Sequence, residues 1–206
     1  MKTIDLQSFE DDINKVLKWK RVEDIPGFPL NNFDDVKKQF SSNQYLIAVD
    51  FIEANALAEI LCGKIYKLLY HILLSTPFII SILAIILALT LKKYLLLIGV
   101  PLSFLCNLLA SPYNPFDFIF KYLAFIFSLI FLWALSTGRE YIALLSAFFV
   151  FPFWIRRFFY FNNRNKIMKI ALNREKIFIY LYQLGKLGLI NKARGKQYLY
   201  TEFISI

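Results

Sequence analysis

Long hydrophobic stretches fill the middle of the chain and predict helices that cross a membrane. Residues 68–91, between Lys67 and Lys92, carry no formally charged side chain. The other apolar stretches cover residues 94–111, 118–137 and 141–161. About 20 residues of helix span the roughly 30 Å hydrocarbon core of a bilayer. The pattern therefore predicts an all-α integral membrane protein built on a bundle of four transmembrane helices.

The second of these stretches allows two interpretations. It contains Gly99 and Pro101, and the turn-rich residues 111–115 follow it. If residues 94–111 form one crossing helix, the chain crosses the membrane four times and both termini lie on one side. If residues 94–116 form a broken or re-entrant segment instead, three true crossings remain. The sequence leaves both possibilities open.

The charge is distributed unevenly along the chain. Residues 1–60 carry a net charge of −4, whereas residues 61–161 carry +6 and residues 162–206 carry +7. An acidic head and a basic tail attract each other if they lie on the same side of a membrane. The predicted domains are an acidic module of amphipathic helices (1–63), the transmembrane bundle (64–161) and a basic helix-plus-hairpin module (162–206).

Apolar residues recur at helical spacing in the acidic module. They predict an amphipathic helix over residues 4–20, a second helix that begins near Phe33, and a third over residues 45–61. Acidic side chains beside the first helix disfavour its binding to anionic lipid. We therefore expect these helices to dock on protein.

The basic module is patterned as two helices followed by a hairpin. Residues 164–172 and 173–184 predict the helices, and Gly185 ends the second one. Residues 189–190 and 197–203 flank a basic tip, which is typical of a β-hairpin.

Part of this module is similar to a known kind of domain. The run Leu181-Tyr182-Gln183-Leu184-Gly185-Lys186-Leu187-Gly188-Leu189-Ile190, followed by Lys196-Gln197-Tyr198-Leu199-Tyr200-Thr201, resembles the last helix and wing of winged-helix domains. A complete domain of that kind needs a further helix upstream, where the fourth hydrophobic stretch lies, so membership is not inferred. The basic and aromatic residues here fit nucleic acid or lipid phosphates, and the positive-inside tendency favours lipid.

Basic residues gather where the fourth stretch ends. We expect Arg156, Arg157, Arg164 and Lys166 at the membrane interface, with their charged groups near lipid phosphates. Because cytoplasmic flanks are enriched in lysine and arginine, this cluster predicts cytoplasmic termini in a multi-pass protein of a bacterial inner (plasma) membrane. The lysine pair at residues 92–93 opposes this orientation, since it would face outward.

A polar stripe interrupts the second stretch. Gly99, Ser103, Asn107 and Ser111 recur at every fourth residue and therefore share a face of a helix. An unsatisfied amide is costly in hydrocarbon, so Asn107 needs a polar partner or water. The stripe is interpreted either as pore-lining or as a surface for packing against a neighbouring helix, and packing is the commoner role of such residues.

Prolines recur within the hydrophobic stretches. Pro77, Pro101 and Pro152 each remove a backbone donor, so each is expected to kink its helix. Broken helices line binding sites in many transporters. Simple kinks are the commoner case, because proline is frequent in transmembrane helices.

The sequence contains no catalytic or metal-binding motif. His71 is the one histidine, and Cys62 and Cys106 are the two cysteines, so no histidine- or cysteine-based metal cluster can form. Neither a glycine-rich phosphate loop nor a nucleophile elbow is present. We therefore expect no enzymatic activity, no catalytic residues and no cofactor.

These features predict a small membrane protein that acts as a pore or channel-like effector. Its expected partners are the lipid bilayer, further copies of itself or a membrane complex, and a soluble cytoplasmic protein; nucleic acid is disfavoured. The alternative is a non-conducting membrane anchor or regulatory subunit that recruits a soluble protein. A small transporter is the third possibility, although the chain lacks the internal repeat common in transporters.

Overall fold

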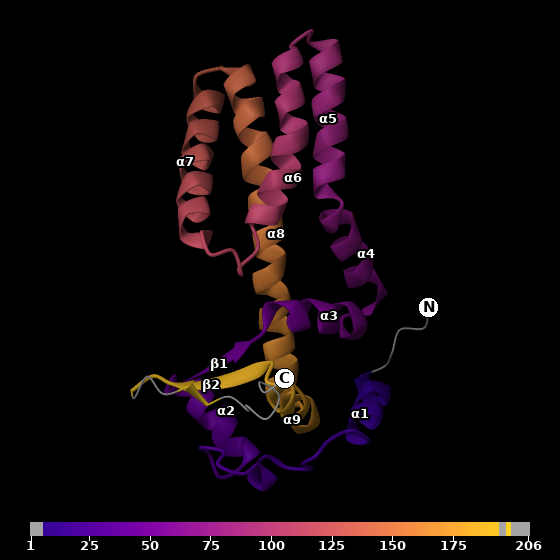
Figure 1. Cartoon of the computed structure of the whole chain (residues 1–206), viewed down its shortest axis with the longest axis vertical. Helices are drawn as coiled ribbons and strands as arrows, with labels where there is room; N and C mark the ends of the chain where they lie inside the picture. Colours follow the sequence, from indigo (N-terminus) through magenta and orange to yellow (C-terminus); the bar gives the residue numbers. More distant parts are fainter. Residues whose placement is uncertain (1–5, 194–196, 199–206) are drawn as a thin grey trace. The chain divides into compact units, whose positions relative to one another are not determined.

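Helices dominate the computed structural model, which describes residues 6–193 and 197–198. The chain divides into two compact units, shown in Figure 1. Unit 1 lies within Met1–Lys64 and Asn162–Ile206, so it combines the two ends of the chain. Unit 2 is the central segment Ile65–Phe161, which holds the hydrophobic stretches.

Unit 2 is a set of apolar helices that run side by side (Figure 1). The helix α8 (Glu140–Asn173) begins in unit 2 and ends in unit 1. The elements before it are α4 (Gly63–Leu74), α5 (Thr76–Thr90), η2 (Tyr94–Ile98), α6 (Gly99–Leu109) and α7 (Asp117–Ser136).

The first hydrophobic stretch forms two helices, whereas the sequence predicts one. The chain turns at Ser75, whose hydroxyl donates a 2.9 Å hydrogen bond to the carbonyl of His71. Pro77 then occupies the first turn of α5, where a missing backbone N–H costs least. The charge-free run therefore contains the last part of α4 and a 15-residue α5.

Among the described residues, two helices are long and apolar enough to cross a membrane: α7 with 20 residues and α8 with 34. The apolar segments Thr76–Thr90 and Tyr94–Leu109 are shorter than the roughly 20 residues a crossing helix needs. The helical class predicted from the sequence is confirmed, but four full-length spans are not.

Small residues let the helices of unit 2 approach one another. Ala84 and Ala88 of α5 are buried against Leu96 and Phe148. A second buried cluster contains Cys106 of α6, Ala110 at the C-cap of α6, Ala124 of α7, and Phe149 and Phe153 of α8. Because neighbouring residues of α8 enter both clusters, this helix connects the α5–α6 pair to α7.

Unit 1 contains a three-stranded antiparallel sheet. Its strands are β1 (Tyr45–Val49), β2 (Leu187–Asn191) and β3 (Gln197–Tyr198), in the order β1-β2-β3. In the pairing of β1 with β2, Ile47 lies opposite Leu189. The other elements of unit 1 are α1 (Leu6–Asn14), η1 (Val22–Asp24), α2 (Phe33–Ser41), α3 (Phe51–Leu61), the end of α8 and α9 (Glu175–Gln183).

The prediction of one helix over residues 45–61 is wrong in its first part. Tyr45, Ile47 and Val49 are buried while the residues between them are more exposed, which is the two-residue period of a strand. Asp50 then starts α3, because its carboxylate accepts 3.0 Å hydrogen bonds from the N–H groups of Ile52 and Glu53.

The N-terminal segment covers α9. The predicted helix over residues 4–20 ends at Asn14, and the predicted helix at Phe33 is confirmed as α2. Gln183 at the end of α9 accepts a 2.8 Å hydrogen bond from the N–H of Lys18 and donates one of 3.2 Å to the carbonyl of Val16. The aromatic contacts between this segment and α9 are Phe9–Tyr180, Phe28–Phe178, Phe28–Tyr182 and Phe33–Phe178.

The helix-plus-hairpin pattern of the C-terminal region is present. Residues 164–172 continue α8, and α9 ends before Gly185, whose φ of +65° suits glycine. Strands β2 and β3 pair as the predicted hairpin. The rest of the strand expected over residues 197–203 lies outside the described residues.

Buried and exposed side chains alternate along β1, so two adjacent residues provide a test and its matched control. Ile47→Lys places a charge in the core of unit 1, because Ile47 is 4% exposed, and burying an unpaired ammonium is costly. We expect unit 1 to unfold, measured as rapid limited proteolysis of the full chain. Leu46→Lys is the control, since Leu46 is 43% exposed and should tolerate the lysine. Equal sensitivity of the two variants would contradict the strand assignment.

Candidate functional site

The polar stripe of α6 begins with a tight helix contact at Gly99. A Cβ atom built on Gly99 would lie 2.3 Å from Cδ2 of Phe148 in α8. Phe148 is itself buried, so its ring has little room to move. At this position glycine allows two helices to approach closely.

Ser103, one turn further, is fully buried and hydrogen-bonded within unit 2. Its hydroxyl lies 2.9 Å from the carbonyl of Val100 and 3.3 Å from that of Pro77. The hydroxyls of Ser103 and Ser81 are 3.2 Å apart. Ser103 therefore joins α6 to α5, as the packing interpretation of the stripe requires.

The prediction that four stripe residues share one helix face is wrong for Ser111, because α6 ends at Leu109. Asn107 and Ser111 nevertheless line the same pocket between α6 and α8. Asn107 and Ser111 stand on one side of a space of about 400 Å³. Arg156 and Tyr160 of α8 stand on another, and Phe104 and Leu108 supply apolar walls. We call this space the α6–α8 pocket. It lies next to the buried cluster in which Cys106 and Ala110 of α6 meet Phe149 and Phe153 of α8.

Arg156 is the charged group of the α6–α8 pocket. Its Nη2 donates a 3.0 Å hydrogen bond to the hydroxyl of Tyr160, and its guanidinium lies 4.9 Å from the centre of that ring. Its Nε is buried and has no hydrogen-bond partner. Within the described part of the chain, no carboxylate forms an ion pair with Arg156.

The adjacent Arg157 has a different environment. Its side chain is 6% exposed and forms two hydrogen bonds with the carboxylate of Asp117 at the start of α7, the second of them 3.1 Å long. Lys121, one turn along α7, lies 2.6 Å from the same carboxylate. The expected contact of Arg157 with lipid phosphate is therefore replaced by an internal ion pair. The spacing of four residues between Asp117 and Lys121 indicates their own pair within α7. No spacing in the sequence indicates that Arg157 joins them.

The other two predicted interfacial residues lie in unit 1. The guanidinium of Arg164 stacks over the ring of Phe51, 4.9 Å from its centre. Lys166 lies close enough to Cys62 for its charge to act on that thiol. Of the four basic residues, Arg156 therefore lines a pocket, Arg157 forms an internal ion pair, and the other two contact residues of unit 1.

The three prolines also differ in position. Pro77 and Pro101 lie in the first turns of α5 and α6, where a proline is compatible with the helix. Pro152 lies inside α8. A proline kinks a helix when it lies in the helix interior, and among the three prolines Pro152 has that position.

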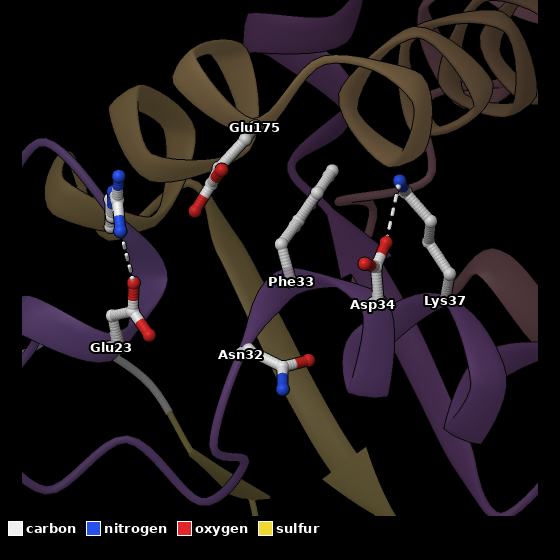
Figure 2. Close-up of a pocket in the computed structure, with 7 residues that line it drawn as sticks. Glu23, Asn32, Phe33, Asp34, Lys37 and Glu175 are labelled. Atoms are coloured by element: carbon white, nitrogen blue, oxygen red, sulfur yellow. Dashed lines mark hydrogen bonds and ion pairs between the residues drawn. The ribbon is translucent and has the colours of Figure 1, made fainter.

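Unit 1 has a polar pocket of about 370 Å³ on its surface, shown in Figure 2. Its charged groups take part in local contacts. Arg21 lies 3.1 Å from Glu23, and Lys37 lies 3.2 Å from Asp34. Glu175 accepts a 2.9 Å hydrogen bond from the N–H of Val22, which ties α9 to the N-terminal segment. The pocket residue that ties elements of unit 1 together is therefore Glu175, whereas the two exposed ion pairs contribute little to stability.

The thiols and carboxylates form no metal cluster among the residues that the structure describes. Cys62 and Cys106 are free thiols, and Cys106 is buried. Burial raises the pKa of the Cys62 thiol, and the nearby charge of Lys166 partly opposes this effect.

No protein-family model, curated protein or solved structure matches this chain.

The contact at Gly99 predicts that α6 cannot accept a larger residue there. Gly99→Ala places a methyl group 2.3 Å from Cδ2 of the Phe148 ring, and overpacking of this kind costs about 1–3 kcal/mol. We expect the melting temperature of the purified protein to fall by about 2–10 °C. Leu105→Phe, which adds volume on the exposed face of α6, is the control and should leave it unchanged. An unchanged melting temperature for Gly99→Ala would show that α6 does not pack on Phe148.

The ion pair at Asp117 generates a second prediction. Asp117→Asn keeps the volume but leaves the buried Arg157 without an anion, and breaking a buried pair in this way costs about 3–5 kcal/mol. Asp34→Asn removes the carboxylate of the exposed Lys37–Asp34 pair and is the matched control, which should change stability little. Both are measured by thermal unfolding in the same detergent. Equal effects would mean that the Asp117–Arg157 pair is not buried.

Proposed function

We propose that this chain is a membrane anchor or regulatory subunit, in which unit 2 lies in a bilayer and unit 1 binds a soluble protein at its surface. The observation that carries the membrane part is the exposure of α7. In its most apolar window of 18 residues, 11% are buried. A core helix of a soluble protein of this composition would be mostly buried.

The exposed side chains of α7 support lipid as its environment. They are large and apolar, and they extend along the whole helix. Contiguous apolar surfaces of this size are rare on water-soluble monomers. In hydrocarbon the same surface has no cost. The exposed residues are Phe118, Ile119, Tyr122, Phe125, Ile126, Leu129, Leu132, Trp133 and Leu135.

The sheet of unit 1 supports an even number of crossings. Strand β1 precedes unit 2 in the chain and β2 follows it, yet the two strands are paired. Two paired strands lie on one side of a membrane. The α7–α8 hairpin accounts for two crossings, and the shorter α5 and η2–α6 add either two or none. The proposed topology is multi-pass with both termini cytoplasmic, in an inner (plasma) membrane, and it disfavours three crossings.

The contacts of the polar stripe favour an anchor over a pore. Gly99 and Ser103 are occupied by packing inside one chain, so they do not line a water path. A pore of several copies is the second candidate, and Asn107, Ser111 and Arg156 support it, because they leave polar groups beside an open space.

Unit 1 is better suited to bind protein than to read nucleic acid through α9. In winged-helix-like arrangements, the helix before the wing must be open to reach a groove. Here Ile177, Phe178, Ile179, Leu181 and Tyr182 are buried, and the chain's own N-terminal segment covers α9. The proposed partner is a soluble protein that binds the outer surface of unit 1.

Topology and conduction can be tested separately with the full chain. Peptide tags at the N- and C-termini should both resist labelling from outside intact cells and both become labelled after permeabilisation. A tag that is labelled from outside on one end alone would refute the even number of crossings.

Conduction is measured on the full chain in liposomes that contain a small dye. An anchor releases no more dye than empty liposomes do, and Asn107→Leu changes nothing. Dye release that falls in Asn107→Leu would overturn the anchor and favour the pore. Recovery of the protein in the membrane pellet after alkaline extraction tests the membrane assignment itself.

A further inference from the structure

We propose that the α6–α8 pocket binds the phosphate-bearing headgroup of an anionic phospholipid, with Arg156 as the residue that contacts the phosphate. This inference rests on the proposed placement of unit 2 in a bilayer. It assigns a defined lipid site to one point on that unit.

The first reason is the unbalanced charge of Arg156. A guanidinium beside apolar helices is costly unless an anion or water compensates it. Arg157 has such an anion in Asp117, whereas Arg156 forms no ion pair within the described residues and keeps a buried Nε without an acceptor. The contact with Tyr160 orients the guanidinium but supplies no negative charge.

The second reason is that hydrogen-bond donors gather around this charge. Asn107 lines the same pocket, and no described residue hydrogen-bonds to its side-chain amide. The hydroxyl of Ser111 accepts a bond of 3.4 Å from the N–H of Tyr113, which leaves its own hydrogen available. None of the described residues that line the pocket carries a carboxylate. A phosphate diester offers the oxygen acceptors and the negative charge that these groups lack.

The third reason selects a lipid over a soluble phosphate. Phe104 and Leu108, one turn apart on α6, form an apolar wall of the pocket, and Leu108 is 74% exposed. The charge-free segment of α8 ends at Ile155, immediately before Arg156. Headgroup phosphates lie at such a boundary, with acyl chains on its apolar side. A volume of about 400 Å³ is in the range of small-molecule sites.

The test measures lipid binding to the full chain in a neutral detergent by native mass spectrometry. Phosphatidylglycerol is titrated against phosphatidylcholine, which carries the same phosphate but no net charge. We expect the anionic lipid to bind roughly tenfold tighter, since charge-assisted hydrogen bonds are the stronger kind. Equal affinity for the two lipids would overturn the proposal.

Three variants locate the site. Arg156→Gln should abolish the preference. Asn107→Leu should weaken binding of phosphatidylglycerol roughly threefold or more, because it removes a donor to the phosphate while leaving every charge in place. Arg139→Gln is the matched control, because Arg139 also stacks on an aromatic ring, 4.9 Å from the centre of Trp133, but lies at the opposite end of the α7–α8 hairpin. The preference should survive in it. Loss of preference in Arg139→Gln to the same degree as in Arg156→Gln would refute a defined site, and thermal unfolding of each variant confirms that it is folded.

A competition arm separates the two sources of phosphate. Inorganic phosphate at millimolar concentration should not displace the bound lipid. Displacement that depends on Arg156 would assign the pocket to a soluble phosphate compound and overturn the lipid assignment. Failure of the proposed function is distinguishable, because a protein outside the membrane would leave the alkaline pellet, whereas a wrong site leaves a membrane-bound protein without lipid preference.

Discussion

The pairing of β1 with β2 is the constraint on which unit 1 depends. Five residues of β1 lie opposite five of β2, and the hydrogen bonds Asp50 N–H to Lys186 carbonyl, 2.8 Å, and Lys192 N–H to Gln44 carbonyl, 3.0 Å, extend the contact at its ends. Because all of unit 2 lies between these strands in sequence, the pairing closes the central segment into a loop. The entropy of closing such a loop grows only slowly with its length. A large insertion is therefore compatible with a stable sheet.

The same closure brings the N-terminal segment onto α9. Aromatic side chains from Phe9, Phe28 and Phe33 meet the helix along its length, and hydrogen bonds through Gln183 and Glu175 hold the backbone of the N-terminal segment against it. The opposite net charges of the two ends of the chain favour this association. One ion pair, Arg174 with Glu10 at 3.5 Å, joins them directly.

Unit 2 is stabilised by contacts of a different kind, because large apolar side chains are exposed on its outer surface. Its interior is arranged by small residues and by a few internal polar contacts, of which Ser81–Ser103 and Asp117–Arg157 are the main ones. Each uses polar groups that would be costly in hydrocarbon without a partner. Arg156 is the exception, because no carboxylate of the described residues forms an ion pair with its guanidinium.

The hydrophobic pattern alone determined the helical class, the position of the apolar segments, the hairpin and the start of α2, because these depend on residues close together in sequence. It failed over residues 45–49, where the apolar spacing is compatible with either a helix or a strand. Pairing with β2 decided between them, and that partner lies far away in sequence. The tertiary structure also separated residues that the sequence pattern groups together. Arg157 pairs with Asp117 while Arg156 lines a pocket, and Gly99 and Ser103 are buried between helices while Asn107 lines that pocket. The two arginines carry the same charge and are neighbours in sequence, so only the contacts across helices distinguish them.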